Sequence, residues 1–188
     1  MDKEKIRILV RDINGKRKYY DVCYEKAVTL SKFIKKYGES DGKSRYEKMM
    51  HRRDGVGYSV ISQNLFTEID NKLGELSINS KWASKNFEAE LEITIDGIKK
   101  IAKPDYILGN KIIEFNGDYW HASPKFYKST DFISYPNEKI LASEVWLRDA
   151  KRLNAMKELG YEIFIVWENE FSNNPIEKIN ECIAFLKS

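Results

Sequence analysis

The stretch PDYILGNKIIEFNGDYWH, residues 104–121, contains a two-residue turn signal, Gly109-Asn110, between two apolar arms. A hairpin closed by this turn places Asp105 directly opposite Glu114. Opposed side chains of antiparallel strands have Cβ atoms ~5 Å apart, so two ionised carboxylates at these positions repel each other. A divalent cation between them removes the repulsion, and Mg²⁺ is commonly held by one or two carboxylates plus water and phosphate oxygens. The hairpin therefore predicts a metal site at Asp105 and Glu114.

One further step in the same register places Lys103 opposite Asn116, on the face that carries both carboxylates. A metal-binding pair and a cation would then share one surface. The alternative is structural, with Asp105 as a turn residue after Pro104 and Glu114 as an exposed strand position. The strand around Glu114 is apolar, however, and an uncompensated carboxylate is costly in a buried strand, which favours the metal site.

The composition is that of a folded protein with a substantial core, since 42% of the 188 residues are hydrophobic and 13% are aromatic. Cys23 and Cys182 lie far apart without a C-x-x-C pattern, which predicts neither a disulfide framework nor a structural zinc site. No run approaches the ~20 apolar residues of a membrane span, and no signal segment is evident. We therefore expect a cytoplasmic protein that does not contact a membrane.

The charge is unevenly distributed along the chain. Residues 1–60 carry 16 Lys and Arg against 9 Asp and Glu, whereas the remaining residues carry 16 against 20. The basic half is the better contact for a polyanion, and the acidic half is the better place for metal chemistry. A solvated basic face is the alternative. The residues that we expect to contact phosphates in this part of the chain are Lys16, Arg17, Lys18, Arg52 and Arg53.

Two parts of the chain are predicted. Residues 6–20 have the pattern of a two-stranded ribbon, and residues 21–38 that of a helix ending at Gly38, so we expect a small basic α/β extension over residues 1–58. The second part, residues 59–188, combines periodic helices with strands. Its pattern indicates an α/β fold of the α+β sandwich type, with a mixed central sheet flanked by helices.

Within the second part, a helix capped by Ser59 or Ser62 comes first. Residues 89–117 contain two turn signals, which predict three or four consecutive antiparallel strands. A strong helix over residues 141–160, a buried strand over residues 161–167 and a closing helix that begins at Pro175 follow.

Pro104-Asp105 followed by Glu114-Phe115-Asn116 resembles the core of the PD-(D/E)xK nucleases. The block GDYWH and the unit LRDAKRLNAMKELGYEIFIVWENEF are similar to the very short patch repair (Vsr) endonucleases and to the phage homing endonucleases of the EDxHD group. This resemblance covers roughly residues 59–171. It implies a restriction-endonuclease-like fold, and an endonuclease that hydrolyses phosphodiester bonds of double-stranded DNA with Mg²⁺ or Mn²⁺.

The resemblance assigns roles to individual residues. Asp105 becomes the core metal ligand, and Glu114-Phe115 supplies a second ligation point through a side chain or a backbone carbonyl. His121 becomes a catalytic histidine with Asp149 as its acidic partner. An imidazole paired with a carboxylate is held in one tautomer and can relay a proton near neutral pH. A structural histidine next to an aromatic residue is the alternative.

Other positions depart from the family pattern. Asn116 stands where the PD-(D/E)xK pattern has a lysine, and Lys103 is a candidate to supply the missing charge. The glutamate that begins the EDxHD pattern is assigned to Glu68, with Glu88 and Glu90 as rivals. The cysteine-rich zinc site of the repair enzymes has no counterpart in this sequence.

DNA contacts are also expected around the site. The aromatic residues Tyr119 and Trp120 either wedge into a base step or pack under the loop, and Arg148, Lys151 and Arg152 lie on the helix of Asp149, where they either contact phosphates or are solvated. The rival functions are a restriction-type endonuclease, a DNA-binding protein with an inactive nuclease fold, and an enzyme that acts on RNA. The sequence leaves open whether the protein is a monomer or a homodimer.

Overall fold

The structure is a computed structural model that describes residues 6–11, 17–22, 28–50, 59–82, 89–135 and 137–188. Its helices are α1 (Leu30–Tyr37), α2 (Glu39–Met50), α3 (Val60–Leu73), the 3₁₀ helix η2 (Gly74–Ser77), α4 (Ala142–Glu158), α5 (Glu168–Asn173) and α6 (Pro175–Lys187). The strands are β1 (Ile6–Arg11), β2 (Arg17–Val22), β3 (Lys81–Trp82), β4 (Leu91–Ile95), β5 (Ile98–Ala102), β6 (Tyr106–Leu108), β7 (Lys111–Asn116), β8 (Phe132–Ser134), β9 (Lys139–Leu141) and β10 (Glu162–Trp167).

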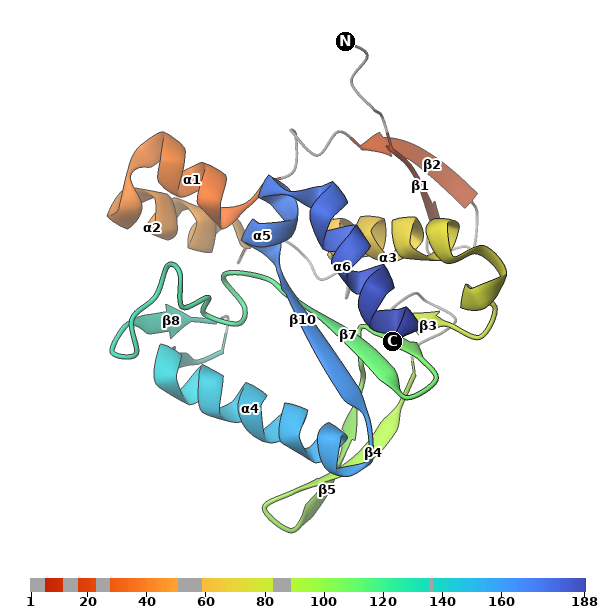
Figure 1. Cartoon of the computed structure of the whole chain (residues 1–188). Helices are drawn as coiled ribbons and strands as arrows, with labels where there is room; N and C mark the ends of the chain where they lie inside the picture. Colours follow the sequence, from red (N-terminus) through yellow and green to blue (C-terminus); the bar gives the residue numbers. More distant parts are fainter. Residues whose placement is uncertain (1–5, 12–16, 23–27, 51–58, 83–88, 136) are drawn as a thin grey trace.

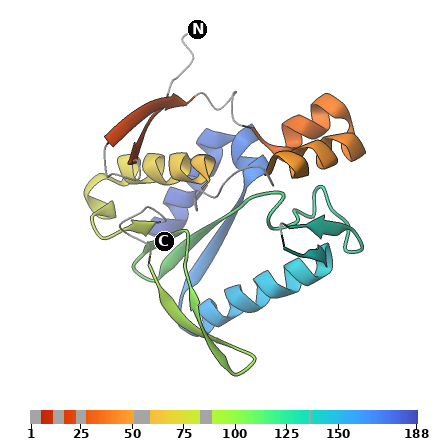
Figure 2. The same ribbon diagram turned by 180° about the vertical axis from the view of Figure 1, so that it is seen from behind.

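A four-stranded mixed sheet lies at the centre, in the order β10-β7-β6-β3. β7 pairs in parallel with β10 and antiparallel with β6. Helices α3 and α6 cover one face of this sheet, and α4 covers the other (Figures 1 and 2). The predicted α/β sandwich with a mixed central sheet flanked by helices is therefore confirmed.

The predicted register of the central hairpin is also confirmed. Tyr106 pairs with Ile113, and Leu108 pairs with Lys111, around the turn Gly109-Asn110. Gly109 adopts a φ of 60°, in the left-handed region that a two-residue hairpin turn requires and that glycine adopts without strain.

The strands predicted over residues 89–117 are present as two antiparallel hairpins, but they do not form one sheet. β4 and β5 form a separate two-stranded sheet, and only β6 and β7 belong to the central one. Pro104 lies between the two hairpins, and its missing N–H cannot contribute to a continuous ladder. The chain therefore leaves one sheet and enters another immediately before Asp105.

Three predicted helix-end signals are observed, but the helix predicted over residues 21–38 begins only at Leu30, because β2 continues to Val22 and Thr29 caps α1. Ser59 is the N-cap of α3, where its side chain accepts a hydrogen bond from the N–H of Ser62. α1 ends at Gly38, whose φ is 82°, and α6 has Pro175 in its first turn. The short elements α5, β8 and β9 were not predicted, because segments of three to six residues show too little periodicity.

Among the described residues, the buried hydrophobic side chains form three clusters. One lies between the central sheet and helices α3 and α6, and a second lies between the sheet, the β4–β5 hairpin and α4. The third joins Leu30 of α1 and Tyr46 of α2 to Tyr119, Tyr127 and Val145. Helices α1 and α2 thus pack on the predicted nuclease part, while the predicted boundary near residue 58 lies outside the described residues.

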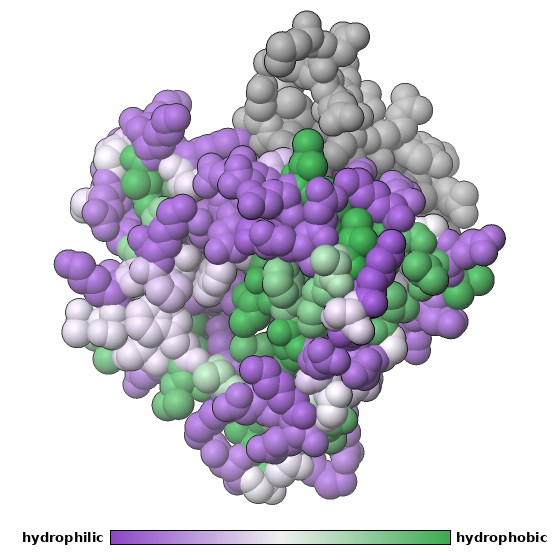
Figure 3. All heavy atoms as spheres, viewed as in Figure 1, coloured by the Kyte–Doolittle hydropathy of each residue, from purple (hydrophilic) through white to green (hydrophobic). Residues whose placement is uncertain are grey.

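The face of the molecule that is turned to the viewer in Figure 3 has polar and hydrophobic regions. Hydrophobic residues gather over the middle of this face, where the edge strand β10 passes between α4 and α6 (Figure 3). In the part of the chain that the structure describes, no helix has the length and apolar character needed to cross a membrane.

Candidate active site

The candidate site begins at Asp105, just before β6. The next step of the observed register beyond Tyr106–Ile113 brings Asp105 opposite Glu114. Oδ2 of Asp105 accepts a hydrogen bond of 2.8 Å from the backbone N–H of Phe115. In a longer β6, a backbone carbonyl would accept the hydrogen bond from the Phe115 N–H. Here the carboxylate of Asp105 accepts it instead.

Glu114 is buried and is paired with Arg152 of α4. Nη1 and Nη2 of Arg152 lie 3.0 and 2.8 Å from Oε2 of Glu114, and Nη2 lies 3.0 Å from Oε1. Nη2 also donates to the carbonyl of Lys103 at 3.2 Å. The expected phosphate contact of Arg152 needs correction, because its guanidinium is used for the carboxylate of Glu114 and only 28% of its side chain is exposed.

The two carboxylates influence each other. Burial, together with the negative charge of Asp105, raises the pKa of Glu114 to about 8, although Arg152 opposes the shift. Burial also raises the pKa of Asp105, against the effects of the Phe115 N–H, Arg152 and His121. One guanidinium therefore does not fully compensate two buried acids, so each acid keeps its proton to a higher pH than a free carboxyl group does.

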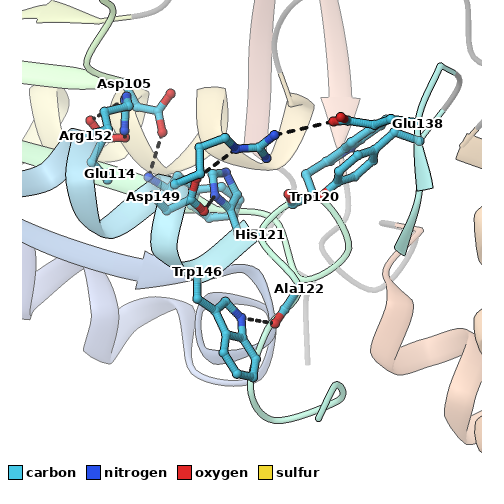
Figure 4. A network of polar contacts seen from close by, with 12 residues as sticks. Asp105, Glu114, Trp120, His121, Ala122, Glu138, Trp146, Asp149 and Arg152 are labelled. Carbon is cyan, nitrogen blue, oxygen red and sulfur yellow. Dashed lines mark hydrogen bonds and ion pairs between the residues drawn. The ribbon is translucent and has the colours of Figure 1, made fainter. Parts of the chain in front are cut away.

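His121 and Asp149 are brought together as predicted. Nδ1 of His121 lies 2.7 Å from Oδ2 of Asp149, and the two side chains are 29% and 21% exposed. Figure 4 shows this pair beside Asp105, Glu114 and Arg152, with Asp149 and Arg152 on the same face of α4. Neighbouring charges of His121 and Asp149 also act on Asp105 and Glu114, respectively, so the two pairs form one electrostatic unit.

The loop that carries His121 is folded by turn hydrogen bonds. The N–H groups of His121, Ala122 and Ser123 donate to the carbonyls of Gly117, Tyr119 and Asp118, respectively. Ala122 is buried and has a φ of 48°, which is uncommon for a residue with a side chain. Its carbonyl accepts a 2.8 Å hydrogen bond from Nε1 of Trp146 on α4 (Figure 4).

The two neighbouring aromatic residues have different surroundings. Tyr119 is 2% exposed, and its hydroxyl donates to the carbonyl of Ser134. Its expected wedge into DNA is therefore corrected to core packing. Trp120 is 38% exposed and stacks on Tyr135 at 5.5 Å between ring centroids.

Two further basic residues of α4, Arg148 and Lys151, have carboxylate partners on the surface. Arg148 contacts Glu138 at 3.5 Å and Asp149 at 3.8 Å. The ammonium of Lys151 lies 2.5 Å from Asp96 of the β4–β5 turn. Exposed pairs of this kind contribute little to stability in water.

The positions proposed for the missing lysine and the leading glutamate lie apart from one another. Asn116 is buried on the α4 side of β7, whereas Lys103 is half exposed and pairs with Glu90 at 3.4 Å. Glu68 belongs to α3, on the opposite face of the sheet, and among the described residues it makes no hydrogen bond or ion pair with the site. The structure does not join it to Asp105.

Four of the predicted site residues lie outside the part of the chain that the structure describes. They are Lys16, Arg52, Arg53 and Glu88. The backbones of Arg17 and Lys18 belong to β2, but their side chains are not described.

Other residues of the site were missed from the sequence. The sequence did not indicate that Trp146 and the buried residues Asp118, Glu168 and Asn169 hold the loop of His121. The contact of Arg152 with Glu114 was not predicted either, but the sequence contained one signal for it. Asp149 and Arg152 are spaced so that both lie on one helix face, which is directed at the sheet.

The donor set fits Mg²⁺ or Mn²⁺ better than a structural metal. Among the described residues, no group of three or more His, Cys, Asp and Glu side chains is arranged to hold a metal ion. The carboxylate of Asp105 and a backbone carbonyl would instead suit an ion that keeps water and phosphate oxygens as its other ligands. The chain matches no model of a protein family, no curated protein and no solved structure.

Proposed function

We propose that the protein is a metal-dependent endonuclease that hydrolyses phosphodiester bonds of double-stranded DNA, of the homing or very short patch repair type. The observation that carries this proposal is the His121–Asp149 pair, 2.7 Å apart, beside the mutually repelling carboxylates of Asp105 and Glu114. A binding protein has no need for this costly combination of buried acids. A cytoplasmic location, where DNA is accessible, belongs to the same proposal.

Asp105 and the backbone carbonyl of Phe115 are the proposed metal ligands. The N–H of Phe115 points toward Asp105, and in a strand the carbonyl of the same residue points to the same side. If the register of β6 and β7 is continued, Pro104 lies opposite Phe115. Proline has no N–H, so it cannot donate a hydrogen bond to the carbonyl of Phe115. Both oxygens of Glu114 accept from Arg152, so Glu114 would support the site by holding Arg152 near Asp105 rather than as a ligand.

Mg²⁺ or Mn²⁺ bound there would supply a Lewis acid that stabilises the negative charge developing on the scissile phosphate. His121 would move the proton. With Nδ1–H donated to Asp149, Nε2 of the neutral ring is free to accept a proton from the attacking water, and the imidazolium can return one to the leaving 3′ oxygen. Asp149 fixes the tautomer and stabilises the charged ring.

Contacts to the remainder of the DNA are proposed for cations around this site. Arg148, Lys151 and Lys103 are exposed, and Arg148 lies 3.8 Å from Asp149 of the His121–Asp149 pair. Trp120 is the aromatic residue available to a base, and the basic residues of the N-terminal part would add salt-sensitive phosphate contacts.

Cleavage of supercoiled plasmid and of phage-sized DNA tests the function. Wild-type protein with Mg²⁺ or Mn²⁺ should give nicked or linear product, EDTA should abolish it, and Asp105→Ala and His121→Ala should slow it strongly. The matched control is Glu92→Ala, which removes an exposed carboxylate from β4 and should leave cleavage unchanged.

The same assay separates the rival functions. Salt-sensitive binding to many DNAs with no cleavage under any metal would contradict the proposal and favour an inactive nuclease fold. Cleavage confined to one short palindrome would favour a restriction-type enzyme, and cleavage of RNA alone would change the substrate class. Lys103→Ala with unchanged cleavage would dispose of the suggestion that Lys103 replaces the missing lysine.

A further inference from the structure

A second buried polar cluster lies at the base of the loop of residues 117–123. Asp118 is completely buried, and its Oδ1 accepts a 2.6 Å hydrogen bond from Nδ2 of Asn169 at the start of α5. Its backbone N–H donates to Oε2 of the buried Glu168 at 3.1 Å. Asn169 in turn accepts from Nζ of Lys125 at 2.8 Å. The cluster joins the loop to the end of β10 through side chains far apart in the sequence.

This carboxylate is energetically unusual. Its second oxygen, Oδ2, is buried and has no hydrogen-bond partner in the described parts of the chain. Burial raises the pKa of Asp118 to about 6, although Asn169, Ser123 and Lys125 oppose the shift. A buried, half-satisfied acid costs stability, so its position calls for a compensating role.

The geometry of the loop indicates that role. Asp118 fixes one end of the loop to α5, and the carbonyl of Ala122 fixes the other end to Trp146 on α4. His121 lies between these two anchors, and its Nδ1 must reach Asp149 on α4. The positive φ of Ala122 persists only when its surroundings hold it in place.

We propose that Asp118 is a positioning residue, which together with Glu168 and Asn169 clamps the loop of residues 117–123 so that His121 stays within hydrogen-bonding distance of Asp149. The proposal deepens the nuclease function and rests on it for its catalytic consequence. The clamp itself is a structural property that is measurable without DNA.

Two tryptophan indoles provide the test, because each reports on a different acid. Nε1–H of Trp146 donates to Ala122 in the clamped loop, and Nε1–H of Trp82 donates to Asp70 on the other face of the sheet at 2.9 Å. Asp118→Ala should make the indole N–H of Trp146 exchange with solvent about tenfold faster, as expected for losing a hydrogen bond to a charged group, and leave that of Trp82 unchanged. The matched control, Asp70→Ala, should have the opposite pattern.

A conservative variant and a kinetic measurement complete the design. Asp118→Asn keeps an oxygen that accepts from Asn169, so it should restore slow exchange at Trp146. In the cleavage assay, Asp118→Ala should lower kcat with KM unchanged, and Asp118→Asn should restore it. Exchange at Trp146 that stays as in wild type, or equal acceleration at both indoles, would overturn the clamp. The expected exchange pattern without any cleavage by wild type would instead contradict only the nuclease function.

Discussion

Acidic side chains on the two faces of the central sheet have very different partners. On the α3 face, Asp70 accepts hydrogen bonds of 2.9 to 3.0 Å from Ser80, Trp82 and Tyr106, all of them neutral donors. On the α4 face, Asp105 and Glu114 oppose each other and share one guanidinium. A carboxylate saturated by neutral donors serves the fold, whereas the paired acids with incomplete compensation are the place where we propose that a cation binds.

The largest expected effect separates these two faces by activity. Asp105→Ala should reduce cleavage about 10³-fold, because a metal ion contributes several kcal/mol of transition-state stabilisation and each 1.36 kcal/mol is tenfold in rate. Asp70→Ala should change the folded protein's cleavage rate little and act on stability instead. Cleavage rates of both variants, measured below their unfolding temperatures, check the difference. Equal losses of cleavage rate in the two variants would contradict the distinction between the two faces.

Arg152 should be the largest determinant of stability on the α4 face. Arg152→Ala leaves the carboxylate of Glu114 buried without its bidentate partner, which should lower the free energy of unfolding by about 3 kcal/mol. The double variant Arg152→Ala with Glu114→Gln removes the unpaired charge and should recover part of the loss. Denaturant unfolding measures both, and a double variant no more stable than the single one would contradict the assigned partnership.

His121→Ala should have a smaller effect on cleavage than Asp105→Ala, about 10²-fold, as is typical of losing a general acid–base group. Asp149→Asn should fall in the same range, since it disturbs the tautomer of the same ring. The two losses should not add in the double variant, because the residues act as a unit. Additive losses would show that Asp149 acts elsewhere.

The smallest predicted effect is a dependence of stability on pH. The pKa of Asp118 is raised in the folded state to about 6, so the native protein binds this proton more tightly than the unfolded chain does. The free energy of unfolding should therefore fall as pH rises from about 4 to 6, relative to that of Asp118→Asn, which lacks the titrating group. Thermal unfolding of both proteins across this window measures the difference, and parallel curves would contradict the shift.

The features that depend on short-range structure were predictable from the sequence. The turn Gly109-Asn110 fixes the register of β6 and β7, and that register fixes the opposition of Asp105 and Glu114. The pairing of His121 with Asp149 came from a resemblance, because the two residues are separated by 28 positions and no periodicity links them.

The features that depend on packing were not predictable. Arg152 has the same charge as Arg148 and Lys151 on α4. It binds Glu114 because of the way this helix packs on the sheet. Tyr119 and Trp120 lie in an irregular loop, where no strand or helix period tells the buried residue from the exposed one. Asp118 and Asn169 meet across 51 residues through the β7–β10 pairing.

The most direct test of the proposed metal site is a calorimetric titration of Mn²⁺ into His121→Ala bound to duplex DNA, since this variant retains the ligands and cuts slowly. We predict one Mn²⁺ per chain in His121→Ala, lost when Asp105→Ala is added and retained when Asp70→Ala is added. Equal binding with and without the carboxylate of Asp105 would contradict the assignment of the site.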